Sequence, residues 1–195
     1  GDYLNKMTAR SVNFPLTSFD ETHNLLRGTT APGVTLWTRD PDGNFVETRV
    51  NQEGVAGTTE DFRLRVNNTG SQQDTFNLTS TLPNGWTVQY YLDANNDGIP
   101  DTLTPITNIT VGSLDLTYVI ARVTIPSDAT PLASPGYDVT FRTTSPLDPT
   151  KTDSVTNGVY INRFAGVTFE PDRNGTGIPG GTVPYTHVVR NTGNA

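Results

Sequence analysis

The sequence of 195 residues contains no cysteine and only two lysines. The absence of cysteine excludes disulfide frameworks, thiolate zinc sites and cysteine catalysis. No apolar run approaches the roughly 20 residues that a membrane-spanning helix needs, so no membrane span is expected. Acidic residues outnumber Lys and Arg by 20 to 13, for a net charge of −7. Nucleic acid is therefore not an expected partner, because little positive surface is left to neutralise phosphates.

Helix signals are also missing, since no long stretch keeps an apolar pattern at i, i+3 and i+4. Threonine is abundant, and 18 Gly and 14 Pro punctuate short segments in which apolar and polar residues alternate. Phe62, Leu64 and Val66, for example, alternate with two arginines, which is typical of a half-buried strand. From Val34 onward we expect about seven or eight such strands, which predicts an all-β fold, an immunoglobulin-like β-sandwich.

Two local features of this sandwich are predicted as well. Three prolines between Pro126 and Gly136 indicate a crossover loop rather than a tight hairpin. Val155, Val159 and Ile161 belong to a last strand, which we expect to be broken or bulged near Asn157-Gly158.

An internal repeat is the most informative feature of the chain. Residues 55–70 align with 178–193 at an offset of 123 (178 minus 55), and residues 33–36 align with 166–169 at an offset of 133 (166 minus 33). The difference of ten residues indicates an insertion at 40–53, which we expect to form an extra hairpin turning at Asp42-Gly43-Asn44.

The repeat divides the chain into three parts. Residues 33–163 are predicted to form one complete sandwich, and residues 166–195 only the first two strands of a second unit. Two strands cannot bury their own apolar face. Either the chain belongs to a longer tandem array, or other strands complete the second unit. Residues 1–32 are an N-terminal extension and a possible donor strand, or a leader that docks loosely. The residues predicted to take part in strand complementation are Val12, Phe14 and Leu16 as donors and Tyr185, His187 and Val189 as acceptors.

The second unit contains the run Gly166-Val-Thr-Phe-Glu-Pro-Asp172 and ends in Asn191-Thr192-Gly193-Asn194. With Gly85-Trp86 and the loop that starts at Asp93, it resembles the tandem Asn-Thr-Gly repeats of bacterial envelope proteins, of the domain-of-unknown-function-eleven type. Ser71 stands where that family prefers Asn, and the insertion is extra. The resemblance implies an Ig-like β-sandwich in long secreted or surface-anchored chains, including surface-layer and adhesin-like proteins. It implies an extracellular or cell-surface location and supplies no catalytic residues.

One loop has the spacing of a calcium site. Counted from Asp93 as position 1, side-chain oxygens stand at positions 1, 3, 5 and 9, and the backbone carbonyl of position 7 would be a further ligand. Gly98 is at position 6. Position 12 is Thr104 instead of a bidentate glutamate. In the alternative interpretation, the Asp and Asn side chains cap a tight turn by bonding local N–H groups. The predicted calcium ligands are Asp93, Asn95, Asp97, Ile99 and Asp101.

No catalytic motif is recognisable, so we expect a non-enzymatic structural module of a filament, surface layer or stalk. Copies of the chain or neighbouring repeats are the expected partners. One alternative is a carbohydrate-binding or adhesive module that binds cell-surface polysaccharide, and another is an accessory domain of a large secreted protein. Trp37, Trp86, Tyr90 and Tyr91 could form a sugar-stacking platform, but Trp86 and Tyr90 share the face of a core valine, which favours burial.

Overall fold

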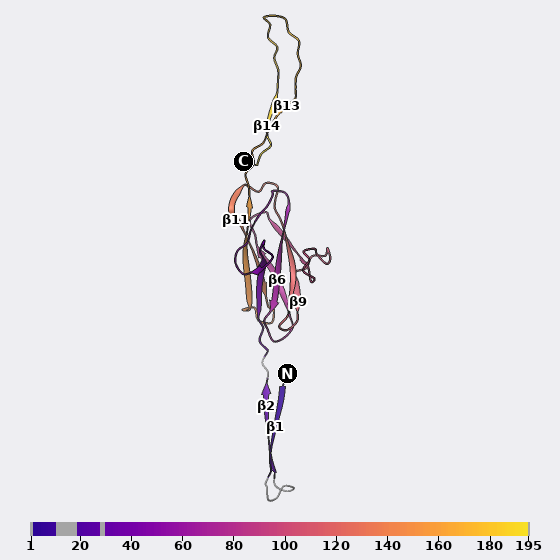
Figure 1. Ribbon diagram of the computed structural model, residues 1–195, viewed down its shortest axis with the longest axis vertical. Coiled ribbons are helices and arrows are strands. Elements are labelled where there is room, and N and C mark those ends of the chain that lie inside the picture. The colour runs from indigo at the N-terminus through magenta and orange to yellow at the C-terminus, as the bar shows by residue number, and fades with distance from the viewer. Residues whose placement is uncertain (1, 11–18, 28–29, 195) are drawn as a thin grey trace.

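The computed structural model describes residues 2–10, 19–27 and 30–194, and every regular element in these ranges is a β-strand. Three parts follow one another along a long axis (Figure 1). They are a hairpin of β1 (Asp2–Arg10) and β2 (Phe19–Arg27), a β-sandwich, and a ribbon of β13 (Val167–Glu170) and β14 (Val188–Asn191). The hairpin and the ribbon project from opposite ends of the sandwich. No helix in the described part of the chain could span a membrane.

The sandwich consists of two five-stranded sheets. The first has the order β4 (Phe45–Val46), β3 (Val34–Arg39), β6 (Thr59–Asn68), β10 (Leu116–Thr124), β8 (Thr87–Leu92). The second has the order β5 (Asn51–Glu53), β12 (Thr152–Ile161), β11 (Leu132–Thr144), β7 (Asp74–Thr81), β9 (Asn108–Val111). Strands β3-β6-β10-β8 and β12-β11-β7 keep the order of an immunoglobulin constant-type domain. The predicted all-β, immunoglobulin-like sandwich is confirmed.

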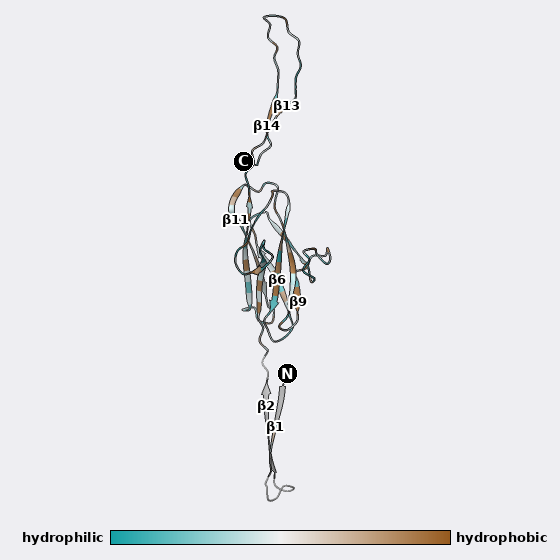
Figure 2. Cartoon of the chain, in the orientation of Figure 1, coloured by the Kyte–Doolittle hydropathy of each residue, from teal (hydrophilic) through white to brown (hydrophobic). Residues whose placement is uncertain are grey.

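The core lies between the sheets, and Figure 2 shows apolar residues alternating with polar ones along the strands that enclose it. The rings of Phe62 and Tyr90 pack against Phe141, with centroids 5.2 and 6.3 Å away. The Tyr90 hydroxyl donates to the Thr79 carbonyl at 2.7 Å, and burial raises the pKa of Tyr90 to about 12. Trp86 is part of the same core. Trp86 and Tyr90 are therefore core residues, as their alternation predicted.

The structure corrects two predictions about the last two strands. β11 begins at Leu132, within the segment 126–136 that was expected to be a loop. β12 is continuous, and the irregularity lies opposite it, near the start of β11. Asn157 explains the misleading pattern, because this polar side chain points into the core on a regular strand. It is buried, donates to Thr38 Oγ1 and accepts from the Val50 N–H, both at 3.2 Å.

The insertion at 40–53 supplies an edge strand to each sheet. The predicted hairpin is present, because β3 pairs antiparallel with β4 across a turn in which Gly43 has a φ of 93°. That left-handed conformation suits glycine. β5 then crosses to the other sheet and pairs parallel with β12. The two added strands cover edges that β3 and β12 would otherwise expose.

Candidate functional site

The ribbon repeats the first strand pair of the sandwich in the same register. In the sandwich, Leu36 of β3 lies opposite Val66 of β6. In the ribbon, Phe169 of β13 lies opposite Val189 of β14. These positions correspond when the two sequence offsets, 133 and 123, are applied to the first and second strands. The partial repeat therefore folds as the opening strand pair of a sandwich.

The Asn-Thr-Gly motif builds the corner that fixes this register. The Thr69 N–H donates to the Gly33 carbonyl at 3.0 Å, and the Thr192 N–H donates to the Gly166 carbonyl at 2.9 Å. A Cβ on Gly33 would lie 2.4 Å from Thr69 Oγ1, and one on Gly166 would lie 2.6 Å from Thr192 Oγ1. Both distances are well inside van der Waals contact. Each corner therefore needs a glycine just before its first strand.

The asparagine of the motif closes the turn after the second strand. Asn68 Oδ1 accepts from the Gly70 N–H at 2.8 Å, and Asn191 Oδ1 accepts from the Gly193 N–H at 2.9 Å. In the sandwich Asn68 is buried, and its Nδ2 also donates to a neighbouring loop carbonyl at 2.8 Å and to the Val111 carbonyl at 3.1 Å. Val111 belongs to β9, so this side chain connects the two sheets.

The residue after the motif ties the corner to the segment that precedes it. Ser71 Oγ accepts from the Ala31 N–H at 2.9 Å, and Asn194 Oδ1 accepts from the Phe164 N–H at 2.8 Å. A hydroxyl oxygen and a carboxamide oxygen can both accept this bond, which explains why serine can stand in place of asparagine. Asn194 Nδ2 also donates to the Asn162 carbonyl at 2.8 Å. Asn194 therefore connects the end of the ribbon to the linker after β12 through two side-chain hydrogen bonds.

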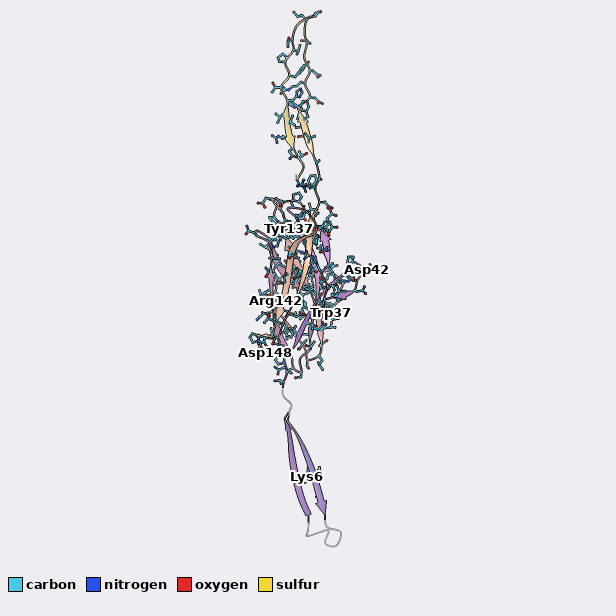
Figure 3. All side chains as sticks on the ribbon, turned by 90° about the vertical axis from the view of Figure 1, so that its left-hand side faces the viewer. Lys6, Trp37, Asp42, Tyr137, Arg142 and Asp148 are labelled. Carbon is cyan, nitrogen blue, oxygen red and sulfur yellow. The ribbon has the colours of Figure 1, made fainter. Side chains whose placement is uncertain are left out.

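Apolar side chains are exposed on the ribbon where their equivalents in the sandwich form the core. Leu36 and Val66 are 1% and 0% exposed. At the same positions of the ribbon, Phe169 and Val189 are 61% and 64% exposed, and Val167 is also exposed. Figure 3 shows the side chains of the ribbon standing clear of the sandwich. Within the described residues, the ribbon has the apolar positions of the inner face of the sandwich, but no second sheet covers them.

Three rings form a strip along this face, the aromatic strip of Phe169, His187 and Tyr185. The His187 ring stacks on Phe169, with centroids 4.4 Å apart and an interplanar angle of 19°. The Tyr185 centroid lies 6.4 Å from that of His187. His187 is half-buried, and its Nδ1 has no hydrogen-bond partner within the described ranges. The equivalent residues of the sandwich, all in its core, are Leu36, Leu64 and Phe62.

The predicted acceptor residues of strand complementation thus come together on the ribbon. Tyr185 and His187 belong to the aromatic strip, and Val189 lies opposite Phe169. The predicted donors lie outside the residues that the structure describes, so donation stays a prediction; these are Val12, Phe14 and Leu16. The segments on either side of them pair with each other as β1 and β2, a hairpin that the sequence pattern did not predict.

The loop predicted to bind calcium folds around a buried carboxylate. Asp93 Oδ1 accepts from the Asp97 N–H at 3.0 Å, and Asp93 Oδ2 accepts from the Gly98 N–H at 3.1 Å. Burial raises the pKa of Asp93, while these bonds and the Arg63 guanidinium, 3.7 Å away, act in the opposite direction. Arg63 also donates to the carbonyl and the side chain of Asn96. A guanidinium therefore supplies positive charge beside this loop.

The other predicted ligands also bond within the loop. Asp97 Oδ1 accepts from the Ile99 N–H at 2.7 Å, and Asp101 Oδ2 accepts from the Ala94 N–H at 2.9 Å. Asn95 Nδ2 donates to Asp97 Oδ2 at 2.9 Å. The structure thus has the turn-capping arrangement, and no three acidic or histidine side chains gather into a metal cluster in the described ranges. Calcium binding stays a prediction.

The aromatic residues considered for sugar stacking on the sandwich do not form an open platform. Trp86, Tyr90 and Tyr91 are buried. Trp37 lies half-buried on the outer face of the first sheet, where the Arg65 guanidinium covers it at 4.0 Å from the ring centroid. Arg65 therefore occupies the position over the indole that a sugar would need.

Comparisons with known proteins give only distant structural likeness. No protein-family model matches the sequence, and no curated protein is detectably similar to it. A family 123 glycoside hydrolase from Clostridium perfringens is similar over 68% of this chain, which spans 27% of the hydrolase, with 13% identity and a TM-score of 0.46. PapD-like domain 7 of human CEP192 has 13% identity and a TM-score of 0.33, with 71% of this chain and 92% of that domain covered. The sporulation control protein Spo0M from Bacillus subtilis has 12% identity and a TM-score of 0.35, with 67% and 49% covered. Similarity at this level carries no functional argument.

Proposed function

We propose that the chain is a non-enzymatic structural module of an extracellular surface assembly, such as a filament, surface layer or stalk. Its units join at the ribbon, where a second sandwich begins. The observation that carries the proposal is the ribbon itself, which has the strand register of a sandwich but leaves its inner face exposed. The extracellular location rests on the resemblance to envelope-protein repeats.

Covering the ribbon would supply free energy for joining units. Complete burial of one large apolar side chain contributes about 1.5–3 kcal/mol. Val167, Phe169 and Val189 are about two-thirds exposed, so burying the rest of these three side chains offers roughly 3–6 kcal/mol before the entropic cost of association. A two-stranded ribbon is marginally stable on its own in water. Association at this face would therefore stabilise both the joint and the ribbon.

The junction supports a mechanical role, because side chains connect the sandwich, the linker and the ribbon. Asn194 bonds to the linker backbone on both sides of Arg163. Asn162 Nδ2 in turn donates to Glu53 Oε1 on β5 at 2.8 Å. These contacts restrain the direction in which the next unit continues. The net charge of −7 would keep such an array soluble by mutual repulsion.

Light scattering after size exclusion, together with electron microscopy, tests this function. We expect the chain to associate in a concentration-dependent way, and Phe169→Ser and Val189→Ser to weaken the association. Leu103→Ser is the matched control, because Leu103 is also an exposed apolar residue but lies on a loop of the sandwich. Equal association of all variants, or a monomer at every concentration, would contradict the proposal.

A carbohydrate-binding module is the second candidate, and the aromatic strip is the observation that favours it. Exposed rings in a row can stack on sugars. The positions of the rings favour the structural role instead, because their equivalents in the sandwich are core residues. Retention on polysaccharide columns separates the two. Retention that Tyr185→Ala abolishes, in a chain that stays monomeric, would favour carbohydrate binding.

A further inference from the structure

In the complete unit, the far edge of β6 is occupied by β10. The strands are antiparallel, with Phe62 opposite Ala121 and Leu64 opposite Val119. Both β10 side chains are fully buried. The small side chain of Ala121 leaves room for the Phe62 ring, which packs on Phe141 across the core. β10 therefore shows which side chains a strand needs in order to pair with this edge.

β14 presents the same edge. Successive residues of an antiparallel strand direct their backbone N–H and C=O groups to opposite sides. The Thr192 N–H donates toward the β13 side. Val189 of β14 therefore directs its own groups to the other side, as the equivalent Val66 does toward β10. His187 and Tyr185 precede β14, and pairing like that of β6 would direct their groups the same way. Within the described ranges, β14 pairs with β13 alone.

This edge has few charged residues to protect it, and the one in β14 is Arg190. Edge strands are usually guarded by charged residues, bulges or inserted prolines. Residues 182–189 contain no Asp, Glu, Lys or Arg. Pro184 precedes β14, and in a strand extended with the alternation of β6 its missing N–H would lie on the β13 side. In such an extended strand the proline would not interrupt the edge along Tyr185, His187 and Val189.

We propose that the free edge of β14 receives an antiparallel strand with the chemistry of β10. Such a strand has apolar residues at alternate positions, with a small residue opposite Tyr185 and a β-branched residue opposite His187. The occupant is a strand of this repeat type, since the equivalent edge in the same chain holds one. This inference rests on the proposed function, because it treats the ribbon as the opening of a second sandwich.

A peptide of residues 113–127, which contains β10, is the probe. Tyr118 of β10 lies opposite Arg65, whose equivalent on the ribbon is Val188 (65 plus 123). A Val188→Cys chain and a peptide carrying Tyr118→Cys should therefore form a disulfide under mild oxidation. The natural chain has no cysteine, so the introduced pair is unique. The register control is a peptide carrying Arg122→Cys instead, and a scrambled peptide keeps the cysteine in place.

We expect the in-register peptide to cross-link about tenfold faster than either control. A tenfold difference corresponds to a preference of about 1.4 kcal/mol for this pairing. Equal rates for the three peptides would overturn the proposal. So would disulfide-linked dimers that form in a mixture of a Met7→Cys chain and a Val188→Cys chain but in neither chain alone, because the hairpin of a second copy would then be the occupant.

The two proposals can fail separately. Assembly of the full chain through the ribbon, without in-register cross-linking of the peptide, would contradict the strand inference and leave the structural function standing. In-register cross-linking of a chain that stays monomeric at every concentration would support the strand inference and contradict the assembly function.

Discussion

Replacing Asn68 by alanine tests the corner motif, because Asn191 offers a matched control in the same chain. Asn68 Oδ1 accepts from the Gly70 N–H, and its Nδ2 donates to two carbonyls, one of them on β9 in the opposite sheet. Asn191 forms the same turn with Gly193, but on the ribbon. Asn68→Ala therefore removes hydrogen bonds from the sandwich, whereas Asn191→Ala removes the equivalent turn bond from the ribbon.

The expected magnitude follows from the contacts. Three hydrogen bonds at about 1 kcal/mol each, two of them leaving carbonyls without this donor, predict that Asn68→Ala lowers the free energy of unfolding by about 2–4 kcal/mol. For a sandwich of this size, that loss should lower Tm by roughly 10 °C. Asn191→Ala should leave the free energy of unfolding of the sandwich within about 0.5 kcal/mol of the natural value.

Urea unfolding followed by tryptophan fluorescence measures the sandwich alone. The only two tryptophans, Trp37 and Trp86, both lie in it. The midpoint should fall for Asn68→Ala at an unchanged slope, which reports lost stability rather than a changed unfolded state. Equal losses in both variants would refute the reasoning, because sandwich and ribbon would then unfold as one unit. A loss below about 1 kcal/mol for Asn68→Ala would also refute it.

Asn194→Ala should loosen the ribbon, since it removes both side-chain bonds to the linker backbone, and small-angle X-ray scattering should show a wider spread of orientations at an unchanged sandwich Tm. Tyr90→Phe should cost about 1 kcal/mol in the urea assay, for the lost bond to the Thr79 carbonyl. Because burial raises the pKa of Tyr90 to about 12, the folded state holds the phenol proton more tightly than the unfolded chain. Stability should therefore fall as pH rises from about 10 to 12, and Tyr90→Phe should lack this component. In the loop around Asp93, Arg63→Gln should strengthen Ca²⁺ binding in calorimetry by removing a competing cation, and no heat from either protein at millimolar Ca²⁺ would contradict the calcium prediction.

Much of the sandwich could be predicted from sequence because burial alternates along its strands. Phe62, Leu64 and Val66 are all in the core. The turns between strands could also be predicted, because they depend on the residues within the turn itself. The repeat also predicted where a second strand pair would start, because an Asn-Thr-Gly corner needs the same residues wherever it forms. Tyr185 and His187 could be selected for the same reason, by their alignment with core positions.

The remaining features depend on contacts between distant residues. Asn157 breaks the apolar pattern of β12, yet it is satisfied by Thr38, which lies 119 residues away in the sequence. The irregularity lies on β11, between Leu132 and Tyr137, where the residues of β12 give no signal of it. The guanidinium beside Asp93 comes from Arg63, 33 residues before Asn96 with which it bonds, and no local spacing signals that contact. The β1–β2 hairpin lacks a sustained alternation of apolar and polar residues.

In the proposed assembly, the corner motif would fix the strand register of a second unit before the covering sheet is in place. On the ribbon its bonds join residues that flank the strand pair, such as Phe164 and Asn194, which are 30 residues apart. The register is thus set by local backbone chemistry rather than by the covering sheet. A slip of one residue would turn Tyr185, His187 and Val189 to the opposite face. The corner holds these three side chains on one face before another strand binds. Only one pairing register then buries them, which lowers the entropic cost of association.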